Sequence, residues 1–178
     1  MVILVLLTGC NDQESHIQRG MDLRDRLMLE QCTFTARITA DYGQYSYTFL
    51  MDCCTDEGGD LSFVVKEPES IAGIAGKLTA SSGFLTFDDV ALAFPLLADG
   101  ELSPVSAPWI FMYTLRSGYL VAAGEDGTQY RLTLRDSYEE DALHVDVWIN
   151  QENIPQRAEI LWQGRSVLSI YIEDFAFM

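Results

Sequence analysis

Hydrophobic and polar side chains alternate along residues 34–42, which is the pattern of a half-buried β-strand. The alternation resumes along residues 45–53, after Gly43 and Gln44, and again along 61–65 after a polar turn that contains glycine. Glycine and short polar residues between alternating segments are typical of hairpin turns. The pattern therefore predicts an antiparallel meander of three strands.

Two segments instead have the 3.6-residue period of amphipathic helices. The first begins at Ile17. The residues expected on one side of it are Ile17, Met21, Arg24 and Met28, with Leu23 and Leu27 alongside. The second lies between Pro104 and Gly118, which are residue types suited to the start and the end of a helix. The residues that share one of its faces are Trp109, Met112, Tyr113 and Arg116.

The remaining apolar segments are short and are separated by turn residues, so they predict further antiparallel strands. Short hairpins are expected within residues 78–94. Five more strands are expected at 119–123, 130–134, 143–149, 158–162 and 167–172. A chain of 178 residues, 48% of them hydrophobic, can bury one core. Residues 17–178 are therefore predicted to form a single α+β domain with an open, curved antiparallel sheet.

The chain is strongly acidic, with 27 aspartates and glutamates against 11 lysines and arginines and a net charge of -16. A charge of this sign repels the phosphates of nucleic acids and anionic lipid headgroups. We therefore expect no nucleic-acid partner, and any membrane attachment must come from a hydrophobic anchor. Solubility is the simplest explanation of the acidity, and a basic partner or cell-wall cations are the alternative.

The N-terminal residues 2–7 are uniformly apolar and are followed by two small residues, Cys10 and a polar stretch. The apolar run is too short to span a bilayer but suits the apolar part of an export signal. Leu7-Thr8-Gly9-Cys10 resembles a bacterial lipobox, in which the leader is cleaved and the cysteine receives a lipid. The resemblance implies a signal peptide at residues 1–9, a tether at 10–16, and an extracytoplasmic protein anchored to the cell membrane by lipidated Cys10.

One feature departs from that pattern, because export signals usually begin with Lys or Arg and neither precedes Cys10. The alternative is that residues 2–7 form a buried N-terminal strand of a cytosolic protein. A buried strand does not require the small residues before Cys10 or the polar stretch after it. The sequence therefore favours the lipobox.

The three cysteines after the lipobox are Cys32, Cys53 and Cys54. Pairing of the first two strands around Gly43-Gln44 places Cys32 opposite Thr55 and only diagonal to Cys53. Such diagonal neighbours have Cα atoms about 7–8 Å apart, beyond the usual range of a disulfide. Free, buried thiols are predicted. Two adjacent cysteines without a nearby histidine also do not supply the four ligands of a zinc site.

Few residues are suited to catalysis. His144 is the sole histidine expected in the folded domain, and it shares a strand face with Asp146 and Trp148. A triad would also need a nucleophile such as Ser169 close by. The acidic run 139–141 is compatible with glycosidase or calcium chemistry, but acids in turns are usually solvated and the spacing of a calcium loop is absent. We predict a noncatalytic protein without a metal or other cofactor.

Short motifs between Ile17 and Phe175 bear on the family. They are Phe34-Thr35-Ala36-Arg37-Ile38, Leu61-Ser62-Phe63 before Pro68-Glu69, Leu85-Thr86-Phe87-Asp88 before Leu92, Leu102-Ser103-Pro104, and Pro155 before Ala158-Glu159-Ile160. In this order they resemble the lipoprotein carrier and receptor superfamily, the LolA/LolB-like proteins, although no single motif is diagnostic. The resemblance implies a curved antiparallel half-barrel wrapped over helices.

Members of that superfamily bind acyl chains in an apolar cavity, and related lipoproteins of spore-forming bacteria act in germination through protein partners. The resemblance implies a lipid-anchored binding protein for an acyl chain or a lipoprotein. The alternative is an envelope scaffold or adaptor in sporulation or germination that acts through protein partners or a homodimer. The candidate cavity-lining residues are Phe34, Ile38, Tyr47, Phe49, Phe63, Trp109, Met112 and Tyr113.

Further aromatic residues that could line such a cavity are Tyr42, Tyr45, Phe87, Trp148 and Trp162. Arg37 and Arg116 are candidate polar anchors near its mouth. The same aromatic residues could also form a filled core without any ligand, because a sheet of this size must bury such side chains in either case.

Overall fold

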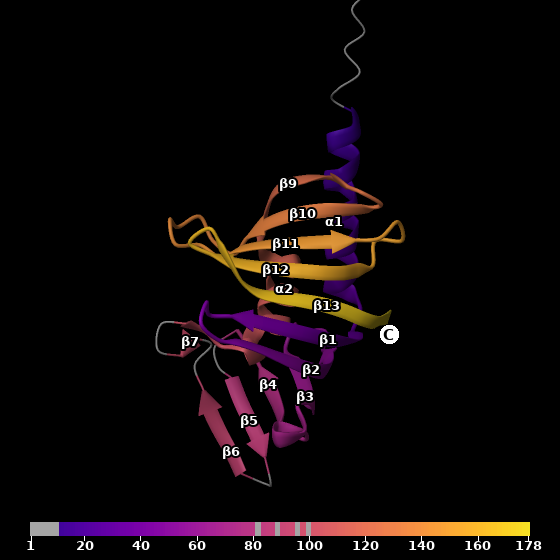
Figure 1. The fold of residues 1–178 in the computed structure, drawn as a ribbon. Helices are drawn as coiled ribbons and strands as arrows, with labels where there is room; N and C mark the ends of the chain where they lie inside the picture. The colour runs from indigo at the N-terminus through magenta and orange to yellow at the C-terminus, as the bar shows by residue number, and fades with distance from the viewer. Residues whose placement is uncertain (1–10, 81–82, 88–89, 95–96, 99–100) are drawn as a thin grey trace, which may run out of the picture.

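The computed structural model describes residues 11–80, 83–87, 90–94, 97–98 and 101–178. One antiparallel sheet of 11 strands dominates it, and helices α1 (Asn11–Leu29) and α2 (Ala107–Ser117) cover one face of this sheet (Figure 1). The strands of the sheet are β1 Cys32–Asp41, β2 Ser46–Thr55, β3 Leu61–Glu67, β4 Ala75–Leu78, β5 Gly83–Phe87, β6 Val90–Phe94, β9 Tyr119–Asp126, β10 Gln129–Arg135, β11 His144–Ile149, β12 Pro155–Trp162 and β13 Arg165–Phe177. The predicted α+β class and open antiparallel sheet are confirmed.

The sheet consists of two meanders joined at its centre, in the order β6-β5-β4-β3-β2-β1-β13-β12-β11-β10-β9. The first meander leads outward from β1 to β6, and the second returns from β9 to β13, which pairs antiparallel with β1. A separate two-stranded hairpin, β7 (Leu97–Ala98) and β8 (Glu101–Leu102), precedes α2. The first and last strands of the sheet are thus neighbours, and both sheet edges are formed by strands from the middle of the chain.

The predicted register of the first hairpin is confirmed. Phe34 lies opposite Cys53, and Cys32 lies opposite Thr55. Both cysteines are buried and free, as the register requires. This pairing puts the apolar residues of both strands on the same face of the sheet, because side chains alternate along each strand.

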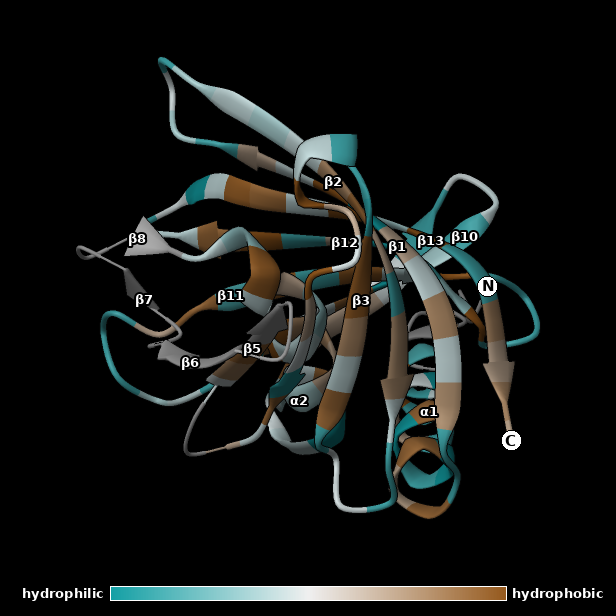
Figure 2. Ribbon diagram, turned by 90° about the horizontal axis from the view of Figure 1, so that it is seen from below, coloured by the Kyte–Doolittle hydropathy of each residue, from teal (hydrophilic) through white to brown (hydrophobic). Residues whose placement is uncertain are grey.

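The core lies between the helices and the sheet face that they cover, which we call the inner face. Along β1 every second residue from Cys32 to Ala40 is buried, and the residues between them are half-buried. Figure 2 shows the same alternation as bands of hydrophobic and hydrophilic colour along β1 and β3. Leu23 of α1 and Phe111 and Met112 of α2 are almost completely buried against this face. Of the aromatic side chains of the first meander, Phe34 and Phe63 are buried in this core.

Helix α1 differs from its prediction in extent and in orientation. It begins at Asn11, not at Ile17, so residues 11–16 are helical and do not form an extended tether. Ile17 and Met28 are 39% and 53% exposed, whereas Leu23 is buried. The buried side is narrow because Gly20 packs closely on β10, where a Cβ would lie 3.2 Å from Leu132. Residues 1–10, including the predicted signal peptide and Cys10, lie outside the described residues.

The two helices bind each other through one arginine each. Arg24 of α1 donates to the carbonyl oxygens of Leu115 (2.8 Å) and Gly118 (2.5 Å) at the end of α2. Arg116 of α2 donates to the carbonyl oxygen of Leu27 (2.6 Å) near the end of α1. Carbonyl groups in the last turn of a helix have no partner within the helix and carry partial negative charge. Each helix therefore supplies the C-terminal cap of the other, and Arg116 is not a polar anchor for a ligand.

Helix α2 begins and ends as predicted, after a 3-10 turn at Pro104–Ser106 and before Gly118. At Gly118 the chain passes so close to α2 that a Cβ would lie 2.6 Å from the carbonyl oxygen of Thr114. Glycine is therefore required at this exit. In the described part of the chain, neither helix is long and apolar enough to cross a membrane.

Candidate ligand-binding site

An opening of about 480 Å³ lies between α2 and the loop that joins β10 to β11. Its lining residues are Ala80, Trp109, Ile110, Tyr113, Thr114, Asp136, Ser137, Glu139, Asp141, Ala142, Leu143 and Trp162. The apolar members come mainly from α2, from Trp162 of β12 and from Ala142 and Leu143 of the loop, and the acidic members all come from the loop. The volume is within the range of about 300–1,000 Å³ that is common for small-molecule sites.

Two aromatic side chains of α2 form one wall of this opening. Trp109 and Tyr113 are four residues apart and stack with ring centroids 4.7 Å apart and an interplanar angle of 17°. Trp109 is buried, whereas Tyr113 remains 39% exposed. The pair thus extends from the core to the surface, and both of these predicted residues are brought together at the opening.

The polar side of the opening is held in place by backbone hydrogen bonds. Asp136 accepts a hydrogen bond from the backbone N–H of Leu143 (2.9 Å), and Arg135 donates Nη2 to the carbonyl oxygen of Glu139 (2.6 Å). Thr114 is completely buried in the adjacent wall, and its hydroxyl has no hydrogen-bond partner within the described residues. The opening therefore combines a fixed acidic loop, an aromatic wall and one unsatisfied hydroxyl.

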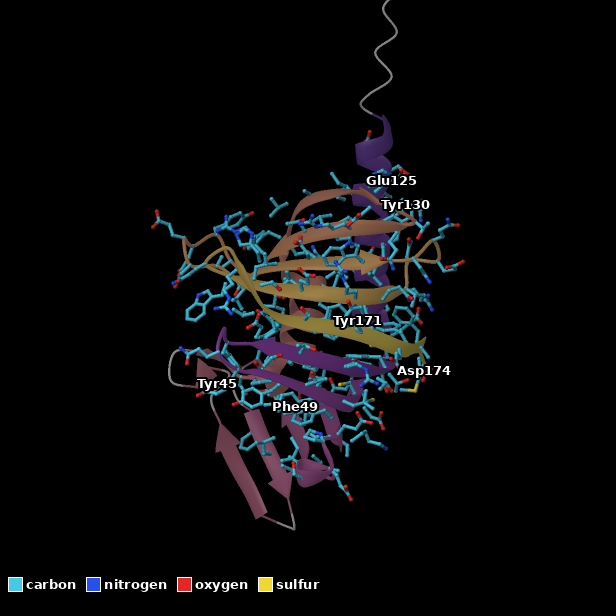
Figure 3. All side chains as sticks on the ribbon, viewed as in Figure 1. Tyr45, Phe49, Glu125, Tyr130, Tyr171 and Asp174 are labelled. Carbon is cyan, nitrogen blue, oxygen red and sulfur yellow. The ribbon has the colours of Figure 1, made fainter. Side chains whose placement is uncertain are left out.

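The other predicted lining residues fall into two groups. Phe34, Ile38, Phe63 and Met112 are buried in the core. Tyr47 and Phe49 lie on the inner face near the turn of the β1–β2 hairpin, opposite Ala40 and Ile38 respectively, where Tyr47 is 50% exposed. Figure 3 labels Phe49 and Tyr45 on this hairpin.

The turn of the β1–β2 hairpin and the β10–β11 loop lie at the same end of the sheet, since the antiparallel strands β1, β13, β12, β11 and β10 are consecutive neighbours (Figure 1). Tyr42 lies beside Tyr47, with ring centroids 6.4 Å apart. Exposed aromatic residues therefore gather at the end of the sheet that also carries the opening.

Sequence reasoning missed the polar part of this site. The acidic run at 139–141 was expected to be an ordinary solvated turn, and nothing in the sequence singled out Thr114 or Ala142. Their common feature is proximity in space, which depends on how far α2 lies from a loop some 25 residues later in the chain. The aromatic residues Trp109, Tyr113 and Trp162 are the predicted lining residues that the structure places at this opening.

Trp148 does not line the opening. It lies on the face opposite the helices, the outer face, under the guanidinium of Arg157 at 3.8 Å, and its Nε1 donates to Asp126 at 2.7 Å. Arg37 is also on the outer face, where it pairs with Glu67 at 3.5 Å. These two residues are structural parts of the outer face and are not parts of a mouth. The side chain of Phe87 lies outside the described part of the structure.

A larger groove of about 750 Å³ crosses the outer face over strands β1 to β5. Outward-facing residues such as Thr35, Val64 and Phe84 line it, and the latter two are more than 40% exposed. Lys77 at its side is held by Asp60 at 3.0 Å. The groove is broad and lies away from the helices and from the exposed aromatic end of the inner face, so we place the candidate site at the smaller opening.

His144 and its strand neighbour Asp146 lie on the outer face, and the carboxylate of Asp146 has other partners. Asp146 is only 5% exposed and accepts hydrogen bonds from Arg131 Nη2 and Thr133 Oγ1, both at 2.6 Å. His144 itself is exposed. Oδ2 of Asp146 is thus in an ion pair with Arg131, and Oδ1 accepts the hydrogen bond of Thr133. Among the described residues, no cluster of three or more histidines, cysteines or acidic residues could hold a metal ion.

Comparison with known proteins supports the fold. No protein-family model and no curated protein matches this chain. A domain from Vibrio parahaemolyticus, named for outer membrane lipoprotein sorting, has a TM-score of 0.53 at 12% identity and covers 93% of both chains. An uncharacterized conserved protein from Thermus thermophilus has a TM-score of 0.52 at 11% identity, covering 91% of this chain and 87% of its own.

A DUF1329 family protein from Desulfovibrio piger is similar to the same degree, with a TM-score of 0.51 at 8% identity and 93% of both chains covered. At these identities the likeness concerns the fold alone. It supports the predicted open antiparallel sheet with helices on one face.

Proposed function

We propose that this protein is a noncatalytic binding protein of the cell envelope that holds an acyl chain, free or attached to a lipoprotein, at the opening between α2 and the sheet. The observation that carries the proposal is the aromatic-walled opening of about 480 Å³ above a filled core. The Vibrio parahaemolyticus domain of the same fold is named for lipoprotein sorting, which supports this class of ligand.

The shape of the interior limits how the ligand is held. Residues deep in the core, such as Phe111 and Met112, are completely buried. A chain would therefore lie along the opening against Trp109, Tyr113 and Trp162 and would not enter the centre of the half-barrel. Burial of methylene groups contributes about 0.8 kcal/mol each, so roughly ten of them suffice for micromolar binding before entropic costs.

Binding is tested with 1-N-phenylnaphthylamine, a neutral apolar fluorophore, together with native mass spectrometry of the protein for copurified lipid. Tyr113→Ala removes an exposed aromatic side chain from the opening, and Tyr171→Ala removes one that is 52% exposed on the outer face (Figure 3). We expect Tyr113→Ala to weaken fluorophore binding about fivefold, since one aromatic contact contributes about 1 kcal/mol.

Tyr171→Ala is expected to leave fluorophore binding unchanged. A loss in Tyr171→Ala alone would place the ligand on the outer face, and an equal loss in both variants would refute the preference for the opening. A complete absence of binding to the unaltered protein would refute the proposal.

The proposal includes attachment to the outer side of the cell membrane through a lipid on Cys10, as the lipobox resemblance implies. The test is the distribution of the full chain between membrane and soluble fractions. Cys10→Ala should move it to the soluble fraction, whereas Cys54→Ala, which removes another thiol, should not. Continued membrane association of Cys10→Ala would remove the anchor from the proposal.

A scaffold or adaptor role is the second candidate, and the edge strand β9 favours it. Tyr119 and Val121 of this strand are 40% and 57% exposed, and one side of β9 has no neighbouring strand in the described sheet. Unpaired edges can add a strand from a partner or from a second copy. Sedimentation equilibrium of the purified protein distinguishes the two, because a lipid-free dimer would favour the adaptor.

A further inference from the structure

The charged residues that line the opening all have the same sign. Three of its lining residues are acidic, namely Asp136, Glu139 and Asp141, and none of the described lining residues is Lys, Arg or His. One positive charge lies beside this rim, because Arg135 precedes the loop and its Nη2 donates to the carbonyl oxygen of Glu139, so the acids outnumber it three to one. A ligand group placed at this rim therefore lies in a negative potential, strengthened by the net charge of -16.

Two of the three carboxylates have no partner in the described structure. Neither Glu139 nor Asp141 forms a side-chain hydrogen bond or ion pair with any described residue, although acids elsewhere do, such as Asp146 with Arg131. Asp136 engages one oxygen with the Leu143 N–H and keeps the other available. The rim thus offers acceptor oxygens that the fold itself does not require.

The buried wall offers one further acceptor. Thr114 is 0% exposed and lines the opening, yet its Oγ1 has no partner within the described ranges. A buried hydroxyl without a hydrogen bond is unfavourable, and natural structures retain such groups rarely. A ligand N–H group would satisfy it.

The aromatic wall suits the same kind of group. Trp109 and Tyr113 lie close to Thr114 on α2. Trp and Tyr rings attract cations through the negative charge of their faces, and carboxylates add to this attraction. Aromatic rings, unpaired carboxylates and an unsatisfied hydroxyl therefore surround one opening.

We infer that the ligand of this opening is a cationic amphiphile: a single apolar chain that ends in an ammonium group. The chain packs against Trp109 and Trp162, while the ammonium donates hydrogen bonds to Thr114 Oγ1 and to the carboxylates of the 136–143 loop. An ammonium has three donors and no acceptor, which matches a site rich in acceptors. This inference rests on the proposed function and adds the chemical class of the ligand.

The test measures displacement of 1-N-phenylnaphthylamine by three ten-carbon amphiphiles below their micellar concentrations: decylammonium, decyl sulfate and decyl maltoside. The unaltered protein should release the fluorophore at the lowest concentration with decylammonium. The double variant Glu139→Gln/Asp141→Asn should weaken the binding of decylammonium at least about fivefold, since each exposed ion pair contributes up to about fivefold in affinity. Binding of decyl maltoside should not change.

Glu14→Gln/Glu152→Gln is the matched control, because it removes the same net charge from two exposed residues outside the opening. If both double variants weaken decylammonium equally, the overall charge explains the preference and the inference is wrong. If the three amphiphiles displace the fluorophore equally well, the proposed binding function stands, but the inference that the ligand is cationic is wrong. If the fluorophore itself does not bind, the proposed function fails as well.

Thr114→Val provides a second test, whose expected result differs from the result that a purely structural role of the hydroxyl would give. Removal of an unpartnered buried hydroxyl should leave the melting temperature unchanged or raise it, because valine has nearly the same shape. The affinity for decylammonium should nevertheless fall severalfold. A lower melting temperature with unchanged affinity would show that the hydroxyl serves the fold and would overturn its assignment to the ligand.

Discussion

The arginine that caps α2 from α1 allows the attachment of the helices to be tested quantitatively. Arg24→Met keeps an unbranched apolar chain of similar length but removes the donors to the carbonyl oxygens of Leu115 and Gly118. Each hydrogen bond from a charged donor contributes about 1.5–3 kcal/mol. Burial lowers the pKa of Arg24, which shows that the guanidinium is partly desolvated at a cost. The two effects oppose each other, and we expect a net loss of about 2–3 kcal/mol.

A loss of this size should lower the melting temperature by about 4–12 °C, because 1 kcal/mol corresponds to about 2–4 °C in a domain of this length. Urea unfolding followed by tryptophan fluorescence measures the free energy directly. Arg26→Met is the matched control, because Arg26 lies on the same helix in an exposed ion pair with Glu30 at 2.9 Å. Such pairs contribute less than about 1 kcal/mol. Equal stability of the two variants would refute the capping role of Arg24.

Three further predictions concern the sheet. Gly76→Ala should destabilise the protein by about 1–3 kcal/mol in urea unfolding, because a Cβ there would lie 2.5 Å from the Phe63 ring. Gly124→Ala is the control and should have much less effect, because a Cβ at that position would have no neighbouring atom within 4 Å. Equal losses of stability in the two variants would contradict the reasoning. Asp146→Asn should cost about 1–3 kcal/mol by the same assay, since it weakens a buried carboxylate's two hydrogen bonds at 2.6 Å, and an unchanged midpoint would show that this ion pair is dispensable. Burial raises the pKa of the Cys32 thiol from 9.0 to about 11, so only about one thiol in a thousand is ionised at pH 8. Labelling with iodoacetamide, mapped by mass spectrometry, should therefore leave Cys32 unmodified in the native protein. The free energy of unfolding should fall as pH rises from 9 towards 11, because the unfolded state loses this proton first.

The first hairpin was predictable residue by residue, and its register shows why. Alternation along residues 34–42 and 45–53 assigns every side chain to a face, and a slip of one residue would bury the polar set instead. Together with a two-residue turn, this leaves one register. The partner of Cys32 could therefore be named from the sequence, and the structure places Thr55 there.

The orientation of α1 was not predictable in the same way. Ile17, Met21 and Met28 form one apolar stripe along α1, and Leu23 and Leu27 form another, so the helical period alone does not choose between them. The structure selects the stripe that contains Gly20, because the absence of a side chain lets the helix approach β10. Ile17 is left at the surface. Close approach between distant segments decides such choices, and a single sequence contains no record of it.

The position of the candidate site follows from the dimensions of the elements. β1 has ten residues and is about 33 Å long, whereas two helices side by side across the strands cover about 20–24 Å. Figures 1 and 2 show α1 and α2 crossing the strands in this way. About 10 Å of the inner face, or roughly three residues of a ten-residue strand, therefore lies beyond the helices themselves. Ile38 and Ala40 at the turn end of β1 are nevertheless 0% exposed, so other parts of the chain cover the face there.

The exposure of β2 shows which end is uncovered. On its inner face Met51 is completely buried beneath the helices, whereas Tyr47, four residues nearer the turn, is 50% exposed. A tyrosine tolerates this position because its ring is apolar and its hydroxyl can reach water. The aromatic residues at this end are thus explained by the limited reach of the helices, with or without a ligand. The unsatisfied hydroxyl of Thr114 has no such explanation, and for that reason it is the better guide to what the opening binds.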